Sequence, residues 1–315
     1  MTIAVIGNIF LDVKGYAAFA YDPQGKNVGD VRFVHGGVGR NVAVNLASLG
    51  APTRLVATVD NSALGGEAVD RLRALGVDVD FVRPAERGMG LWLAILDENG
   101  DLAGSISRQP NFDGLLGLLD DAGADALRGA THVALSIDLT ESVSRRAIAL
   151  ARRRGLPVYG LPNNLQVALR HPELLAELDL FVCNHIEFDR LRGADEGLAS
   201  NNWSGLAADA KLHAVRSFAD ARGLQALVVT QGAEGSIFYD RASGLAAHQP
   251  AFPTRLVDSS GAGDAFSAGV IYGLSLGLPL DRAVVCGTRL AGWVVASERN
   301  ECPDAAERMR REGIL

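Results

Sequence analysis

LVDSSGAGDAFSAGV, residues 256–270, sets two glycines and then an aspartate where an apolar helix begins. A helix N-terminus presents free backbone N–H groups and a partial positive charge, so phosphate binds there readily. Gly261 and Gly263 would let the backbone cradle such an anion. Asp264 would then stand beside the anion, where it could take a proton from a hydroxyl attacking the phosphorus. Taken alone, the pattern is equally well explained by an aspartate that caps a helix after a glycine turn.

The rest of the chain alternates short apolar strands with longer helical patterns. Helical patterns cover residues 40–50 and 142–155, and each ends at a glycine. Such alternation is typical of βαβ units, in which a mostly parallel sheet carries helices on both faces. We therefore expect a doubly wound α/β core. Its strands are predicted at residues 3–8, 53–59, 132–137, 157–161, 179–184 and 226–232.

Two stretches depart from this alternation. Residues 27–37 alternate with a period of two, and residues 87–107 read as two strands joined by an Asn99–Gly100 turn. Because no crossover helix follows either one, we expect them to form a small antiparallel sheet that projects from the core as a lid. The predicted core is then 1–12, 36–86 and 108–315, with the lid at 13–35 and 87–107.

Composition excludes several classes of function. The chain has 315 residues, 48% of them hydrophobic, which is enough for one large domain or two. Its net charge of −7 argues against a nucleic-acid partner, and no apolar run is long enough to span a membrane. Three widely spaced cysteines without a CxxC pair argue against disulfides or structural zinc. We expect a cytoplasmic globular protein, and composition alone indicates no more than that.

Four further motifs each allow a functional and a purely structural interpretation. Gly37 and Asn41 in GGVGRN could hold sugar hydroxyls or form a strand-to-helix turn, and Asp12 could bind a polyol or be a solvated loop acid. Asn184 and Glu187 could face Mg²⁺ and nucleotide phosphates or begin a helix. The glycine turn in VVTQGAEGSIFYD, residues 228–240, could border a nucleotide or be an ordinary turn; its candidate residues are Thr230, Gly232 and Gly235.

Together, and in this order, the motifs resemble the ribokinase-like (PfkB) carbohydrate kinase family. GGVGRNVAVNLASLG, residues 36–50, looks like the family's N-terminal signature, and residues 257–274 look like its C-terminal one. Asn184 and Glu187 match its Asn-x-x-Glu motif, and the similarity extends from the first strand to near Asn300. The resemblance implies an ATP- and Mg²⁺-dependent phosphotransferase with a doubly wound core and a β lid.

The resemblance also implies a role for each motif. Asp264 would be the general base, and the backbone of Ser260, Gly261, Ala262 and Gly263 the anion hole for the γ-phosphate. Asn184, Thr230, Gly232 and Gly235 would border ATP, and Glu187 would act on Mg²⁺ through water. Asp258 and Ser260 correspond to a monovalent-cation site, filled by K⁺ in relatives that use one. Asp12, Gly37, Arg40 and Asn41 would hold the substrate.

The acceptor is less well defined. GGVGRN after a lid strand, and SERNECPD at residues 297–304, look closest to pseudouridine kinases, which implies phosphorylation of pseudouridine to its 5′-phosphate. SRQPNFD, residues 107–113, departs from that subgroup. The alternatives are a kinase for ribose, fructose, 2-keto-3-deoxygluconate or adenosine, and a sugar sensor without catalysis. The outer face of the lid is expected to form homodimer contacts.

Overall fold

A nine-stranded sheet forms the centre of the molecule in the computed structural model, which describes residues 2–137, 139–162, 165–196 and 203–314. The strand order is β13-β12-β11-β10-β9-β8-β1-β4-β5. The seven strands from β11 to β5 run parallel, and β12 and β13 extend one edge in antiparallel pairing. The predicted doubly wound core is confirmed. The strands are β1 Thr2–Ile6, β4 Thr53–Asp60, β5 Asp78–Ala85, β8 Ala130–Ser136, β9 Val158–Leu161, β10 Leu180–Asn184, β11 Ala226–Thr230, β12 Ser236–Asp240 and β13 Leu245–Gln249.

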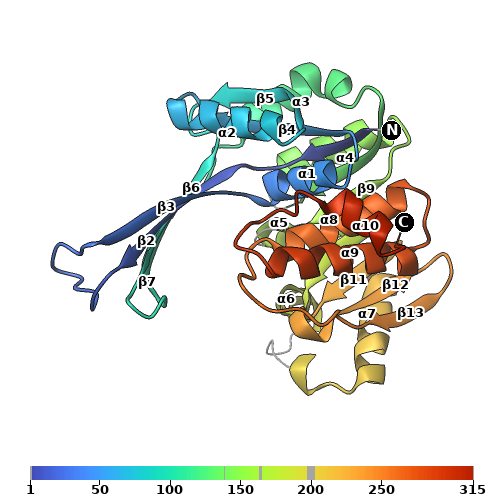
Figure 1. Ribbon diagram of the computed structural model, residues 1–315. Coiled ribbons are helices and arrows are strands. Elements are labelled where there is room, and N and C mark those ends of the chain that lie inside the picture. Colours follow the sequence, from blue (N-terminus) through green and yellow to red (C-terminus); the bar gives the residue numbers. More distant parts are fainter. Residues whose placement is uncertain (1, 138, 163–164, 197–202, 315) are drawn as a thin grey trace.

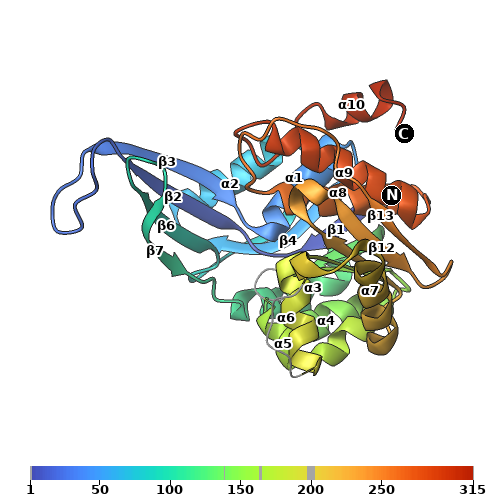
Figure 2. The ribbon, with the colours of Figure 1, turned by 90° about the horizontal axis from the view of Figure 1, so that it is seen from below.

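Helices cover both faces of this sheet (Figures 1 and 2). The strands are continuously apolar because alternate residues enter different cores: Val228 packs with one cluster, and Leu227 and Val229 with the other. One face carries α1 Val38–Ser48, α2 Ala63–Ala74, α8 Ala262–Ser275, α9 Leu280–Val295 and α10 Ala305–Arg311. The other carries α3 Asp113–Ala126, α4 Glu141–Arg152, α5 Gln166–Arg170, α6 His185–Glu196 and α7 Ala208–Arg222, with short 3₁₀ turns at Pro172–Glu177 and Trp203–Gly205.

A second, four-stranded sheet projects from the core as an arm (Figure 1). It is called the lid sheet here, and its strands are β2 Phe10–Ala17, β3 Gly29–Gly36, β6 Gly90–Leu96 and β7 Leu102–Arg108. Each of its two hairpins is antiparallel, and the two are joined side by side by a parallel pairing of β2 with β6. Segments far apart in the sequence therefore build one sheet, as the sequence predicted.

The register of the lid sheet separates two faces. Val13 pairs with Phe33 and Leu93, and Leu93 pairs with Ile106, so one face is apolar. Asp12 pairs with Trp92, so both lie on the opposite face.

The connection between β1 and the lid sheet passes directly against the start of α1. Gly37 precedes α1 with a φ of 97°, and a Cβ there would lie 2.9 Å from the carbonyl oxygen of Asn8 and from the amide nitrogen of Phe10. Only glycine combines that backbone conformation with so close an approach. The first residues of α1 are thereby held at the base of the lid sheet. Across the described residues, no helix is both long enough and apolar enough to cross a membrane.

Candidate active site

The N-terminus of α8 carries Gly261 and Gly263, the two glycines of the opening motif, and they differ in conformation. Gly261 caps the helix with a φ of 75°, and a Cβ there would lie 3.1 Å from Cβ of Asn300. Gly263 has an ordinary φ and no atom within 4 Å of the place where its Cβ would be. Gly261 is therefore required by the turn itself. Gly263 instead leaves open space beside the free N–H groups of the first helical turn.

Asp264 lies in that first turn and is held by one hydrogen bond. Nδ2 of Asn41 donates to its Oδ2 at 2.8 Å, and Oδ1 has no hydrogen-bond partner among the described residues. Burial raises the pKa of Asp264 to about 6, although the hydrogen bond from Asn41 and the charge of Arg40 act in the opposite direction. At neutral pH the group is an ionised carboxylate whose proton affinity is well above that of an ordinary aspartate.

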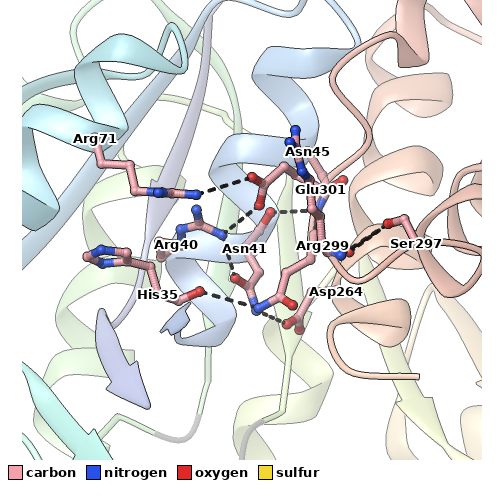
Figure 3. A network of polar contacts seen from close by, with 10 residues as sticks. His35, Arg40, Asn41, Asn45, Arg71, Asp264, Ser297, Arg299 and Glu301 are labelled. Atoms are coloured by element: carbon pink, nitrogen blue, oxygen red, sulfur yellow. Dashed lines mark hydrogen bonds and ion pairs between the residues drawn. The ribbon is translucent and has the colours of Figure 1, made fainter. Parts of the chain in front are cut away.

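Arg40 and Asn41 take part in one polar network behind Asp264 (Figure 3). Nη1 of Arg40 donates to Oδ1 of Asn41 at 3.1 Å and to Oε2 of Glu301 at 3.2 Å. The Arg40 side chain is only 3% exposed. This differs from the expectation that Arg40 stands beside the substrate, because its guanidinium turns away into the protein toward Glu301. Asn41 lies nearer the site, between Arg40 and Asp264.

Asp12 presents a carboxylate at the base of the lid sheet. It is half-buried on β2, and a Cβ on Gly36 would lie 3.0 Å from its Oδ2, so the side chain lies against Gly36 at the end of β3. Burial raises the pKa of Asp12, with Lys14 acting against the rise. Within the described part of the chain, neither of its oxygens has a hydrogen-bond partner. A half-buried carboxylate without a partner is suited to accept hydroxyl groups of a ligand.

A cavity of about 610 Å³ lies at the α8 N-terminus. Thr230, Gly232 and Gly235 line it, together with Ala262 and Gly263. Three of the four predicted nucleotide residues, all but Asn184, and part of the predicted anion hole therefore border one space. Much of the remaining wall is apolar, which suits a flat aromatic base. That part of the wall includes Phe252, Pro253, Leu256, Phe266, Ala291 and Val295.

Asn184 and Glu187 cap the start of α6 reciprocally. Oδ1 of Asn184 accepts from the N–H groups of Ile186 and Glu187, and Oε2 of Glu187 accepts from the N–H of Asn184 at 2.8 Å. This capping box is one of the two interpretations that the spacing allowed. Asn184 also pairs with Thr230 across β10 and β11, so both residues lie at the same edge of the sheet as the cavity. The capping contacts are what the structure shows. Binding of nucleotide by Asn184, or of Mg²⁺ by Glu187, is a proposal.

Asp258 and Ser260 form a tight turn before α8. The N–H of Ser260 donates to Oδ1 of Asp258 at 2.8 Å. In the residues with described positions, no group of three or more His, Cys, Asp or Glu side chains could hold a metal ion.

Sequence reasoning missed two parts of the site. Glu301 contacts Arg40 across 261 positions of the chain. It lies within SERNECPD, but that stretch did not single out Glu301 as a site residue. The cavity wall at residues 251–256 has no regular secondary structure, and so no periodicity that would have revealed it.

A doubly wound core, a β lid and an acidic residue at a glycine-bordered helix N-terminus define a small-molecule kinase. Residues 2–302 match the model of the pfkB family carbohydrate kinases, and the chain belongs to that family. It is a phosphotransferase with a hydroxyl acceptor.

Three known proteins illustrate the similarity. A guanosine-inosine kinase from Exiguobacterium acetylicum is 36% identical over 299 residues, 95% of each chain. The pseudouridine kinase of Escherichia coli (strain K12) is 24% identical over 96% of this chain and 93% of its own. The structure of Arabidopsis thaliana ribokinase, complexed with ribose and ATP, matches with a TM-score of 0.81 at 19% identity, covering 98% of this chain and 97% of that one. That match shows a shared fold.

Proposed function

We propose that this protein transfers the γ-phosphoryl group of ATP to the 5′-hydroxyl of a nucleoside. The observation that carries the proposal is the position of Asp264, whose raised pKa suits a base and which follows directly on Gly263 at the edge of the cavity. The cavity suits the adenine and ribose of ATP, with the phosphates directed toward the start of α8. Asp12, on the lid sheet, suits the acceptor's ribose hydroxyls.

The proposed chemistry follows from these positions. Ionised Asp264 takes the proton of the acceptor hydroxyl, whose oxygen attacks the γ-phosphorus, and the bond to the bridging oxygen breaks to release ADP. The N–H groups of the first turn of α8 stabilise the charge on the transferring group. Mg²⁺ would neutralise phosphate charge, held by the nucleotide and, through water, by Glu187. The Asp258–Ser260 turn is the proposed place for K⁺.

Among nucleosides, guanosine and inosine are the first candidates. The support is the 36% identity to a guanosine-inosine kinase across nearly the whole of both chains. Pseudouridine, implied by the motifs and by the 24% identical relative, is the second candidate. All three carry a ribose, so Asp12 and Asp264 serve each of them. A cytoplasmic location is proposed as well, supported by three free and buried cysteines.

An acceptor panel tests the proposal. ADP formation would be measured with Mg²⁺ and ATP, with and without K⁺, across guanosine, inosine, pseudouridine, adenosine, ribose, fructose and 2-keto-3-deoxygluconate. Selective turnover of guanosine and inosine is the expected result. Turnover of a free sugar alone would contradict the nucleoside assignment, and no turnover of any acceptor would favour a sensor.

Trp92 provides a prediction specific to a nucleoside acceptor. It is half-buried next to Asp12 on the same face of the lid sheet, and no ring contact or hydrogen bond of its indole is found within the described residues. Stacking of a base on an aromatic ring is worth about 1–3 kcal/mol, so Trp92→Ala should raise the KM for the nucleoside by roughly tenfold. The KM for ATP should not change. Ile95→Ala, on the opposite face, is the control, and an unchanged nucleoside KM in Trp92→Ala would exclude the stacking role.

The apolar face of the lid sheet supports the proposed homodimer. Val31, Phe33 and Ile106 are 58%, 60% and 71% exposed on it. A second copy of the same face would cover these side chains, as self-complementary dimer contacts do. Sedimentation should give twice the 33.2 kDa of one chain, and Phe33→Asp should give the monomer. A monomeric wild-type protein at micromolar concentration would contradict the dimer.

A further inference from the structure

A chain of polar contacts connects Glu301, near the C-terminus, to Asp264 (Figure 3). Glu301 accepts from Nη1 of Arg40 at 3.2 Å, and the same nitrogen donates to Oδ1 of Asn41 at 3.1 Å. Nδ2 of Asn41 then donates to Oδ2 of Asp264 at 2.8 Å. The Arg40 and Glu301 side chains are 3% and 7% exposed. Two charged residues are thus nearly closed off from solvent behind the proposed base.

Arg40 fixes the orientation of the Asn41 amide. A guanidinium only donates hydrogen bonds and an ionised carboxylate only accepts them, whereas an amide does both. Asn41 stands between Arg40 and Asp264, so only one orientation satisfies both neighbours. In the flipped orientation, the amide NH₂ would face the guanidinium and its oxygen would face the carboxylate. Without Arg40 the preference for the observed orientation weakens.

Glu301 supplies the countercharge that a buried arginine needs. Its other oxygen lies 3.8 Å from Arg71 on α2, a side chain that is 53% exposed. The neighbouring Asn300 ties the same segment to the site: its carbonyl accepts from Nδ2 of Asn45 at 2.8 Å, and its Nδ2 donates to the carbonyl of His35 at 3.3 Å. The segment after α9 is thereby fixed to α1 and to the end of β3.

We propose that Arg40 and Glu301 are positioning residues for the transfer reaction, which hold the carboxylate of Asp264 in its reactive orientation through the amide of Asn41. Neither residue contacts the reacting atoms. This inference rests on the proposed function, in which Asp264 is the base.

The charges around this chain of polar contacts predict that removing Arg40 and removing the charge of Glu301 shift the pKa of Asp264 in opposite directions. Arg40 lowers the pKa of Asp264, and Glu301 partly neutralises Arg40. The other charged or titratable groups facing the network are Arg71 and Glu67 of α2 and His35 of β3. Removing Arg40 should therefore raise the pH at which activity appears, and removing the charge of Glu301 should lower it.

The test compares pH profiles of kcat/KM for the acceptor. Arg40→Met should lower kcat about tenfold, as loss of supporting contacts commonly does, and should move the acid limb up by roughly one pH unit. Glu301→Gln should move the limb down. The double variant, Arg40→Met with Glu301→Gln, leaves neither partner of the Arg40–Glu301 pair as an unpaired buried charge and should keep the raised limb. If Arg40→Met does not fold, the double variant therefore still tests whether Arg40 acts on Asp264.

Two controls exclude a general effect. Arg54→Met removes a partly buried ion pair with Asp78, elsewhere in the core, and should leave the limb in place. His35→Gln should leave it in place too, and a limb that disappears with His35 would overturn the proposal.

The same experiment separates the two levels of the proposal. An unmoved limb in both Arg40→Met and the double variant, with Asp264→Asn inactive, overturns the positioning role alone. An active Asp264→Asn variant overturns the assignment of Asp264 as the general base, and the proposed mechanism with it.

Discussion

Asp264→Asn will lower kcat by about a hundredfold or more, because a general base typically contributes that much and an amide cannot accept the proton. Substrate and ATP affinities should stay close to wild type. The amide oxygen can still accept the hydrogen bond that Asn41 donates to Oδ2 of Asp264 at 2.8 Å, so the fold around the start of α8 is preserved. Steady-state rates and equilibrium binding of ATP measure the two effects separately.

Asp281→Asn is the matched control for this variant. Asp281 lies in the first turn of α9, as Asp264 lies in the first turn of α8. If an aspartate there served only the helix dipole, the two variants would behave alike. Near-normal turnover of Asp264→Asn would remove the general-base assignment.

Activity should depend on pH through the same carboxyl group. Because burial raises the pKa of Asp264 to about 6, kcat/KM should rise through pH 6 as the base ionises and level off above it. The free energy of unfolding changes in the opposite direction. The stabilising contribution of Asp264 is fully present below the pKa of this group in the unfolded chain, and it is lost as the pH rises through about 6. The active protein therefore carries its base in the less stable, ionised form.

Asp12→Ala will lower kcat/KM for the acceptor by at least about a hundredfold. Hydrogen bonds to a charged group contribute about 1.5–3 kcal/mol each, and a carboxylate that holds two hydroxyls makes two of them. A free energy of about 1.4 kcal/mol corresponds to a factor of ten. The loss should fall mainly on the KM for the acceptor, since Asp12 lies on the lid sheet, away from the residues that line the cavity.

Asp30→Ala controls for the loss of negative charge on the lid sheet. Asp30 lies on the same face as Asp12, near the tip, where it is exposed and pairs with Arg32. Its removal should leave the acceptor KM within about twofold, as surface charge changes usually do. Equal losses in both variants would mean that Asp12 acts through the general field of the lid and makes no specific contact.

The core and the lid sheet could be predicted because their signals are local. Strands buried on both faces, such as β11, are continuous apolar runs, and Gly100 marks the lid hairpin with a φ of 86°. The edge strand β5 was not predicted, because its buried valines, Val79 and Val82, are three positions apart and so give no period of two. The predicted spans placed the lid at 13–35 and 87–107, and its strands occupy residues 10–36 and 90–108.

The site could be predicted only in part, because its contacts join distant segments. Asp264 and the α8 glycines form one local motif, and Asn41 was found through another. Arg40 points in a different direction from Asn41, because neighbouring residues on a helix point about 100° apart, and its burial beside Glu301 could not be read from the motif. Asn184 and Glu187 remained ambiguous, since capping and nucleotide binding both call for a carboxylate three residues after a polar cap.

The most direct measurement of the central claim is product analysis by phosphorus NMR, with wild type and Asp264→Asn run side by side on guanosine and MgATP. We expect wild type to form ADP and guanosine 5′-monophosphate in equal amounts, and Asp264→Asn to form both at about a hundredth of that rate or less. ATP loss that yields inorganic phosphate without a phosphorylated nucleoside, or equal rates in the two proteins, would contradict it.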